Sequence, residues 1–404
     1  MSEQIDLKKF YPTAFVLYIT YFVHGIGVSI LGQYKQNFAQ NWGAPLLADG
    51  TYDVSSVLMV IAALGLGRLI TLPFSGTMSD KLGRKLSSLI GIVCYVLYFV
   101  GVVFAPNMYI AYVFALFGGA ANSFLDTGVI PACMEIIVKP SGLAPIFTKL
   151  FISFGQLALP FMLGYVAAAA MPFTSIFFLM AIILVVVGVI LIFMPMPPST
   201  SAPKTKDGKK DKLHLTPEGI AVILIGFTCT STFQLWLNCN QEFGKLAGMA
   251  DPSQIQSYYS MGSIAAVFLT AVLVAKVRPA KFLIIYPVIS AIMLFLVYLI
   301  ATPTICIVGG FIIGFSAAGG VLQMATATIN EMYPTAKGRI TGILMIASSV
   351  ANYVILSIAG AITKAGGVEG PKYVILLNLG VTVVGILLAI FVNMRYGKKE
   401  QVAA

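Results

Sequence analysis

Three ionisable residues lie inside long hydrophobic stretches of the sequence: His24, Arg68 and Asp126. A charged side chain at the centre of a membrane helix costs about 2.5–3.5 kcal/mol on insertion scales, so such residues face protein or water and usually serve a function. A carboxyl group can bind and release a proton, imidazole titrates near neutral pH, and arginine binds anions through several donors. These residue types therefore predict proton transfer beside a polar ligand.

Two interpretations of these residues stay open from the sequence. Arg68 and Asp126 can form a structural ion pair that joins two helices. Alternatively, Arg68 contacts an anionic or polyhydroxyl substrate while Asp126 takes and releases the coupled proton, because a substrate that competes for Arg68 frees Asp126 to bind a proton. His24 can act as a proton carrier, or as a neutral hydrogen-bond partner of Tyr21 or Thr20 on adjacent turns.

Uncharged amides and hydroxyls form a second set of candidates. The hydrophobic segment that begins at Pro217 carries a polar stripe at three- and four-residue spacing, Ser231, Gln234, Asn238 and Gln241, and the first segment carries Ser29, Gln33 and Gln36. That spacing places the side chains on one helix face, and amides both donate and accept hydrogen bonds, which suits a hydroxylated solute. The expected substrate-binding residues are Arg68, Asn122, Gln156, Gln234, Asn238, Gln323, Asn352 and Tyr353. Hydrogen bonding between helices is the alternative for each of them singly.

The composition indicates what positions these residues. Of the 404 residues, 58% are hydrophobic and only 10% are charged, whereas soluble domains carry about 25% charged residues. The sequence therefore predicts an all-α membrane protein. Since about 20 apolar residues cross the hydrocarbon core, we expect twelve transmembrane helices: 13–36, 54–76, 86–105, 108–137, 146–169, 172–195, 217–239, 256–275, 282–301, 304–331, 340–363 and 373–394.

The distribution of basic residues predicts the orientation. Most of the 25 Lys and Arg residues fall between hydrophobic segments on the side that also holds both chain ends, so both termini are expected in the cytoplasm. The polar start lacks a small-residue cleavage site, so we expect the first helix to be retained. The net charge of +10 lies in short clusters at helix ends, which argues against nucleic-acid binding.

The residues that enzymes require are missing from the sequence pattern. The five cysteines, Cys94, Cys133, Cys229, Cys239 and Cys306, have no metal-ligand or disulfide spacing and are predicted to be reduced packing residues. Two histidines allow no metal site or catalytic set, and no phosphate-binding glycine loop occurs. We therefore expect no enzyme activity and no cofactor, with an ion or solute gradient as the source of energy.

The two halves of the chain resemble each other. A polar stretch, 196–215, separates residues 1–195 from residues 216–404, and we predict a mobile cytoplasmic linker between two six-helix bundles. One repeat places Gln36, Phe38 and Gly43 in correspondence with Gln241, Phe243 and Gly248. A second repeat places Glu135, Gln156 and Gly164 in correspondence with Glu331, Asn352 and Gly360. Two halves related by an axis along the membrane normal are one of the known transporter repeat arrangements.

A charged turn follows the second hydrophobic segment. It reads Gly76-x-x-x-Asp80-Lys81-x-Gly83-Arg84-Lys85 and resembles the loop 2–3 signature of the major facilitator superfamily. Glu331-x-x-Pro334-x-x-x-Gly338-Arg339-x-x-Gly342 resembles the superfamily's loop 10–11 signature, whereas the segment after the eighth span lacks the glycines and the aspartate of a second loop 2–3 copy. The resemblance implies twelve helices around a central cavity and transport by alternating access.

The subfamily is less well defined. The segment 124–128 weakly resembles fucose-type sugar:proton symporters, which also carry an aspartate in the first span, where this chain has His24. We expect proton-coupled symport of a small polar solute, either a sugar or a hydroxylated organic acid. The alternatives are a proton-driven drug or metabolite exporter, whose fifth-span Gly-Pro signature is missing here, a lipid flippase, a membrane enzyme and a nonconducting sensor.

Charged residues near cytoplasmic helix ends are expected to form gating pairs, with solvated helix-end charges as the alternative. The predicted gating residues are Gly76, Asp80, Gly83, Arg84, Lys85, Glu135, Lys149, Glu331 and Arg339. The expected partners are a small-molecule substrate, protons and the lipid bilayer, and the protein is expected to be a monomer. The expected location is the cell membrane with several crossings, which in a bacterium is the inner membrane.

Overall fold

The computed structural model describes residues 7–48, 50–137, 143–197, 214–274, 277–333 and 337–403. Helices account for nearly all of them, and their β-structure is limited to one isolated bridge between Leu46 and Tyr52. The prediction of an all-α protein is confirmed. Most of the predicted linker, 198–213, lies outside the described residues, as do Pro334 and the side chain of Arg339.

The chain forms two compact units. Unit 1 comprises Met1–Ile30 and Leu66–Lys210, and unit 2 comprises Leu31–Gly65 and Asp211–Ala404. Residues 31–65 therefore group with the second half of the sequence. The predicted division at 196–215 into two six-helix bundles stays a prediction.

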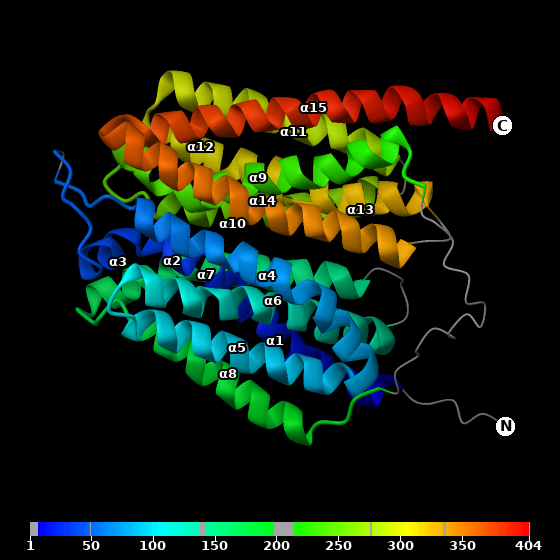
Figure 1. The fold of residues 1–404 in the computed structure, drawn as a ribbon, viewed down its shortest axis with the longest axis horizontal. Helices are drawn as coiled ribbons and strands as arrows, with labels where there is room; N and C mark the ends of the chain where they lie inside the picture. Colours follow the sequence, from blue (N-terminus) through cyan, green and yellow to red (C-terminus); the bar gives the residue numbers. More distant parts are fainter. Residues whose placement is uncertain are drawn as a thin grey trace. The chain divides into compact units, whose positions relative to one another are not determined.

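Unit 1 is built from long helices that pack lengthwise (Figure 1). They are α1 (Tyr11–Gly27), the second part of α4 (Ser55–Leu82), α5 (Arg84–Phe104), α6 (Met108–Ile136), α7 (Leu143–Ala168) and α8 (Ser175–Phe193). Helix α5 packs against α6 and α8, and α1 packs against α7. Glycines allow the closest approach, because a Cβ atom on Gly25 would overlap the backbone of Ile152 and one on Gly155 would overlap the backbone of Phe22.

Unit 2 contains the remaining helices. They are α2 (Ile30–Gln33), α3 (Lys35–Asn41), the start of α4, α9 (Pro217–Leu246), α10 (Gln254–Leu273), α11 (Pro279–Ile300), α12 (Pro303–Ile313), α13 (Val321–Met332), α14 (Lys337–Gly366) and α15 (Gly370–Ala403). Helix α9 packs against α14 and α15, and α10 packs against α12. The buried aromatic side chains of Trp236, Phe243 and Tyr259 belong to one hydrophobic cluster in this unit.

Two predicted spans are interrupted. The sequence predicts one helix over 304–331, but α12 ends at Ile313, a π-helical turn follows over Gly314–Ala318, and α13 begins at Val321. Gly320 has a φ of 144°, which only glycine adopts readily. The first predicted span, 13–36, is likewise divided among α1, α2 and α3. Hydropathy misses both interruptions because it does not report backbone hydrogen bonding.

The repeated motif ends α3 and α9 with the same geometry. Gly43 and Gly248 both have left-handed φ angles, 71° and 83°. The Ala44 N–H donates to the Ala39 carbonyl at 2.9 Å, and at the corresponding place the Met249 N–H donates to the Gly244 carbonyl at 2.9 Å. This bond across five residues, with glycine in the left-handed conformation, is the Schellman ending of a helix. The sequence repeat thus marks a repeated local structure.

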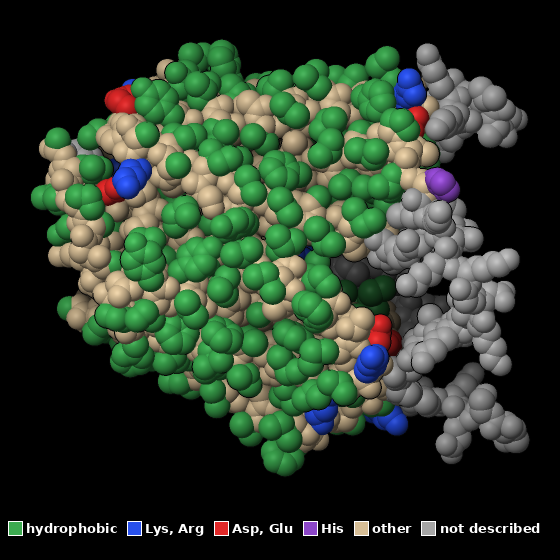
Figure 2. Space-filling model, in the orientation of Figure 1, with side chains coloured by type: hydrophobic (Ala, Val, Ile, Leu, Met, Phe, Trp, Pro, Cys, Tyr) green, Lys and Arg blue, Asp and Glu red, His purple; other side chains and the backbone are tan. Residues whose placement is uncertain are grey.

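Several helices are long and apolar enough to cross a membrane. Length and composition give 10 candidate spans among the described residues; the last, Ile340–Tyr396, covers both α14 and α15, and α10 is outside this set. Hydrophobic side chains cover most of the face drawn in Figure 2, while the charged side chains visible there lie toward helix ends. The protein is therefore a multi-pass membrane protein. The count of twelve spans and the cytoplasmic termini stay predictions.

Two smaller predictions are confirmed. The Thr216 side chain accepts a hydrogen bond from the Gly219 N–H at 3.2 Å, with Pro217 as the first residue of α9, as expected for a helix cap. All five cysteines are free thiols, and only Cys94 is more than slightly exposed.

Candidate functional site

Arg68 and Asp126 form an ion pair inside unit 1. The Arg68 Nη2 atom donates to Asp126 Oδ2 at 2.8 Å, and the two side chains are 17% and 21% exposed. The Tyr21 hydroxyl donates to the other carboxylate oxygen, Oδ1, at 2.9 Å. Each oxygen of Asp126 therefore has its own donor, one charged and one neutral.

The helices place this pair deep in the membrane segment. Arg68 lies 14 residues before the end of α4 at Leu82, about 21 Å along the helix at 1.5 Å per residue. A Cβ atom on Gly67 would overlap the backbone of Leu116, so α4 and α6 are in direct contact at this level. The Ser123 hydroxyl also donates to the Arg68 carbonyl at 3.0 Å. Close helix packing therefore holds the two charges together.

His24 is buried one turn from Tyr21 on α1. Its Nδ1 atom hydrogen-bonds the Tyr95 hydroxyl of α5. The expected partners, Tyr21 and Thr20, are occupied elsewhere, since Tyr21 donates to Asp126 and Thr20 donates to the Leu17 carbonyl at 2.6 Å. The partner prediction is wrong because it considered only neighbours on the same helix. The Tyr21 ring still meets His24 edge-on, with ring centroids 5.9 Å apart.

Helix α7 brings Gln156 and Lys149 to the same region. Gln156 is 4% exposed; its Nε2 atom lies 3.5 Å from the Ser29 hydroxyl and its Oε1 atom has no hydrogen-bond partner. Lys149 makes no ion pair among the described residues, and its side chain is partly buried. It lies seven residues before Gln156, which places it on the same face of α7.

The other predicted substrate-binding residues are dispersed. Asn122 is half-buried on α6. In unit 2, Asn238 is buried and donates to the Gln234 side chain at 3.0 Å, while its own Oδ1 atom has no partner. Asn352 and Tyr353 of α14 lie against Gly65 of α4, where an added Cβ atom would be 2.6 Å from the Tyr353 amide nitrogen. Gln323 is exposed.

The polar stripes of the first and seventh predicted spans meet in unit 2. The Gln241 side chain donates to Gln33 Oε1 at 2.5 Å. Immediately beyond these glutamines, Lys35 and Glu242 form an ion pair at 2.6 Å, and Lys35 also donates to the Asn238 carbonyl. Sequence analysis did not predict this pair. The sequence feature that could have indicated the pair is the position of Glu242 directly after Gln241, the glutamine of the repeated motif.

The predicted gating residues of unit 1 surround Arg84. Its guanidinium group lies 2.7 Å from Asp80 and 3.8 Å from Glu135, and it donates to the Ser79 hydroxyl at 2.9 Å. Gly83, with a φ of 94°, makes the turn between α4 and α5. Lys85 donates to two carbonyls at the end of α8.

The remaining predicted gating positions are less informative. Gly76 packs loosely near Thr127, 3.9 Å from an added Cβ atom. Glu331 is exposed at the end of α13, and the Arg339 side chain lies outside the described residues.

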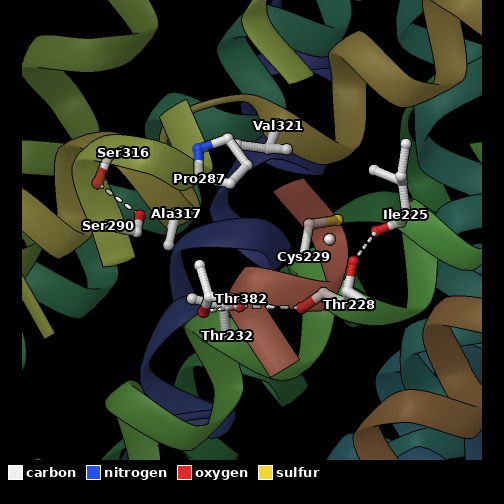
Figure 3. A pocket seen from close by; sticks show the side chains of 11 residues that line it. Ile225, Thr228, Cys229, Thr232, Pro287, Ser290, Ser316, Ala317, Val321 and Thr382 are labelled. Carbon is white, nitrogen blue, oxygen red and sulfur yellow. Dashed lines mark hydrogen bonds between the residues drawn. The ribbon is translucent and has the colours of Figure 1, made fainter. Parts of the chain in front are cut away.

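A small cavity lies in unit 2 beside the π-helical turn (Figure 3). Its polar lining is mostly hydroxyl groups that already pair with one another: Ser290 with Ser316 at 2.7 Å, and Thr232 with Thr382 at 2.8 Å. Sequence analysis named none of these residues. Because these hydroxyls are mutually hydrogen-bonded, the cavity offers a ligand fewer free polar groups than the Asp126 region does.

Comparison with known proteins identifies the family. The profile described as Major Facilitator Superfamily matches residues 17–250 and 241–403. The chain is 33% identical over 402 residues to the inner membrane transport protein YdiN of Escherichia coli K12, covering 96% of this chain and 92% of that protein. It is also 33% identical over 397 residues to YfkL of Bacillus subtilis 168, named an uncharacterized MFS-type transporter, covering 96% and 97%.

A solved structure is similar in fold. The crystal structure of a D-xylose–proton symporter matches with a TM-score of 0.74 at 18% identity, covering 95% of this chain and 97% of that one. At this identity the likeness concerns the fold alone. Since the family profile and the relatives extend over nearly the whole chain, this protein belongs to the major facilitator superfamily of membrane transporters.

Proposed function

We propose that this protein is a secondary active transporter that couples proton movement to symport of a small polar solute, a sugar or a hydroxylated organic acid, by alternating access. The observation that carries the proposal is the contact set of Asp126, whose two carboxylate oxygens accept from Arg68 and Tyr21 inside the membrane segment. The named transport proteins among its relatives also support an inner membrane location.

The geometry supports a specific coupling step. Protonation of Asp126 removes the negative charge that holds Arg68, so the guanidinium becomes available to a solute. Conversely, a solute that binds Arg68 leaves the carboxylate without its charged donor, which favours proton uptake. Proton and solute therefore help each other to bind, which a symporter requires.

Two amide side chains of unit 1 are candidates to bind the solute. Gln156 of α7 has an unpartnered carbonyl oxygen, and Asn122 lies one turn before Asp126 on α6, so the two amides can accept from and donate to hydroxyl groups. The Arg84 cluster with Asp80 and Glu135 is a candidate gate, because Arg84 joins the start of α5 to Glu135 at the end of α6 through a contact of 3.8 Å, longer than its 2.7 Å contact with Asp80.

The test is substrate-driven proton uptake. Purified protein is reconstituted into vesicles that contain a pH-sensitive dye, and aldoses and aldonic acids are added outside. We expect a solute that acidifies the lumen and that an imposed proton gradient accumulates, and we expect Asp126→Asn to abolish accumulation while downhill exchange persists.

Asp251→Asn is the matched control, because Asp251 is exposed in the turn between α9 and α10. If Asp126→Asn still accumulates the solute against its gradient, Asp126 is not the coupling group and the proposal is wrong. Movement of labelled lipid between leaflets, without solute uptake, would instead indicate a flippase.

A further inference from the structure

We propose that Lys149 binds a carboxylate group of the solute, so that the transported solute is a hydroxylated organic acid and not a neutral sugar. The inference rests on the proposed function, because it concerns the substrate of the same site. It assigns Lys149 a binding role where the sequence predicted a gating role.

The charge distribution of unit 1 leaves Lys149 unbalanced. Among its described residues, unit 1 contains three acidic side chains. Asp126 is paired with Arg68, and both Asp80 and Glu135 are paired with Arg84. None of the ion pairs among these residues includes Lys149. A cation inside a membrane protein is costly unless an anion or water compensates it, and an anionic solute would supply that compensation.

Contacts between α1 and α7 fix the depth of Lys149. The Tyr18 ring of α1 packs against Phe147 and Phe151 of α7, the residues two positions on either side of Lys149. Lys149 is therefore level with Tyr18, one turn before Tyr21. It lies six residues after the start of α7 at Leu143, about 9 Å along the helix. Lys149 thus lies nearly two turns inside α7 and one turn of α1 from the Tyr21 contact with Asp126.

The position of Lys149 around α7 directs it away from lipid. The strongly exposed hydrophobic residues of α7 include Phe154, Phe161 and Tyr165. At 100° per residue, Lys149 is about 140° from Phe154 around the helix axis but only about 20° from Gln156. The lysine therefore lies on the face of α7 that carries the unpartnered amide oxygen of Gln156.

Lys149 and the polar residues of unit 1 match the parts of a hydroxylated acid. Lys149 supplies a cation for the carboxylate, and Arg68 joins it once Asp126 is protonated. The amides of Gln156 and Asn122 bind hydroxyl groups, as their donors and acceptors allow. Carriage of one monocarboxylate with one proton moves no net charge, so uptake should not respond to membrane potential.

Matched pairs of acids and neutral sugars test the inference. Binding to purified protein is measured by thermal shift and calorimetry for D-gluconate and D-glucose, D-xylonate and D-xylose, and D-glycerate and glycerol. We expect at least one acid to bind while its neutral partner does not. Lys149→Met should weaken that binding about tenfold or more, since bonds to charged groups are strong, and Lys149→Arg should retain most of it.

Controls separate binding from folding and from coupling. Lys281→Met, at an exposed position on α11, should leave acid binding unchanged, and the unliganded melting temperature checks that each variant folds. Binding of neutral sugars in preference to acids, unchanged acid binding in Lys149→Met, or no binding by any of these probes overturns the inference. Proton uptake driven by a neutral sugar would overturn the inference about Lys149 but would agree with the proposed function. Uphill accumulation of an acid by Asp126→Asn would refute the coupling role alone.

Discussion

Glu242→Gln is the substitution whose effect follows most directly from the structure. Lys35 Nζ lies 2.6 Å from Glu242 Oε2, and the two side chains are 1% and 15% exposed. Replacing the carboxylate by an amide leaves a buried ammonium group whose acceptors, the Asn238 carbonyl and the new amide oxygen, are both neutral. Loss of one partner of a buried pair costs about 3–5 kcal/mol, and the partial exposure of Glu242 favours the lower value.

A loss of about 3 kcal/mol can be converted into a melting temperature. With an unfolding entropy of about 2.1 cal/mol/K per residue over 404 residues, it corresponds to a decrease of about 3–4 °C. Differential scanning fluorimetry in one detergent measures this shift. The double variant Lys35→Met/Glu242→Gln should recover most of the loss, because it removes the unpaired charge.

The chain contains a matched control for this experiment. Lys372 and Glu369 also form an ion pair, at 2.8 Å, but their side chains are 38% and 52% exposed. Surface pairs contribute about 0–1 kcal/mol, so Glu369→Gln should shift the melting temperature by about 1 °C or less. Equal shifts for Glu242→Gln and Glu369→Gln, or a double variant that melts as low as Glu242→Gln, would refute the argument from burial.

Three further substitutions test the packing around the site. Gly65→Val should reduce uptake strongly, because its Cβ atom would lie 2.6 Å from the Tyr353 amide nitrogen, whereas Gly342→Ala, with no atom within 4 Å, should retain uptake. Gly248→Ala, at a φ of 83°, should destabilise the fold by about 1–2 kcal/mol, and an unchanged melting temperature would contradict this. Arg84→Ala leaves two carboxylates without their cation and should lower both thermal stability and uptake, and normal values of both would exclude a gating role.

Much of the fold could be predicted because the bilayer restricts the choices. A hydrophobic segment inside lipid must satisfy its own backbone hydrogen bonds, so hydropathy predicts helices there with few alternatives. The turn at Gly83 and the cap at Thr216 were also predictable, because each depends on residues adjacent in sequence. The interruption between α12 and α13 was not predicted, because hydropathy does not detect the backbone change at Gly320.

The candidate site was only partly predictable for a related reason. Arg68 and Asp126 could be identified without a structure, because a charged side chain within a hydrophobic segment is costly to bury. Tyr95 as the partner of His24, and Glu242 as the partner of Lys35, required the tertiary structure, because these residues lie 71 and 207 positions apart. An apolar context shows that a polar group needs a partner, but it does not show which one.

The amino-acid sequence by itself determined that this chain is a helical membrane protein and which residues are expensive to bury there. Both properties depend on side-chain chemistry and on spacing within single helices. The tertiary structure decided which buried groups meet, that both oxygens of Asp126 are engaged, and that Lys149 is level with Tyr18, one turn from Tyr21. Those outcomes depend on the register and rotation of packed helices, which small residues such as Gly25 and Gly155 set through contacts between segments distant in the chain.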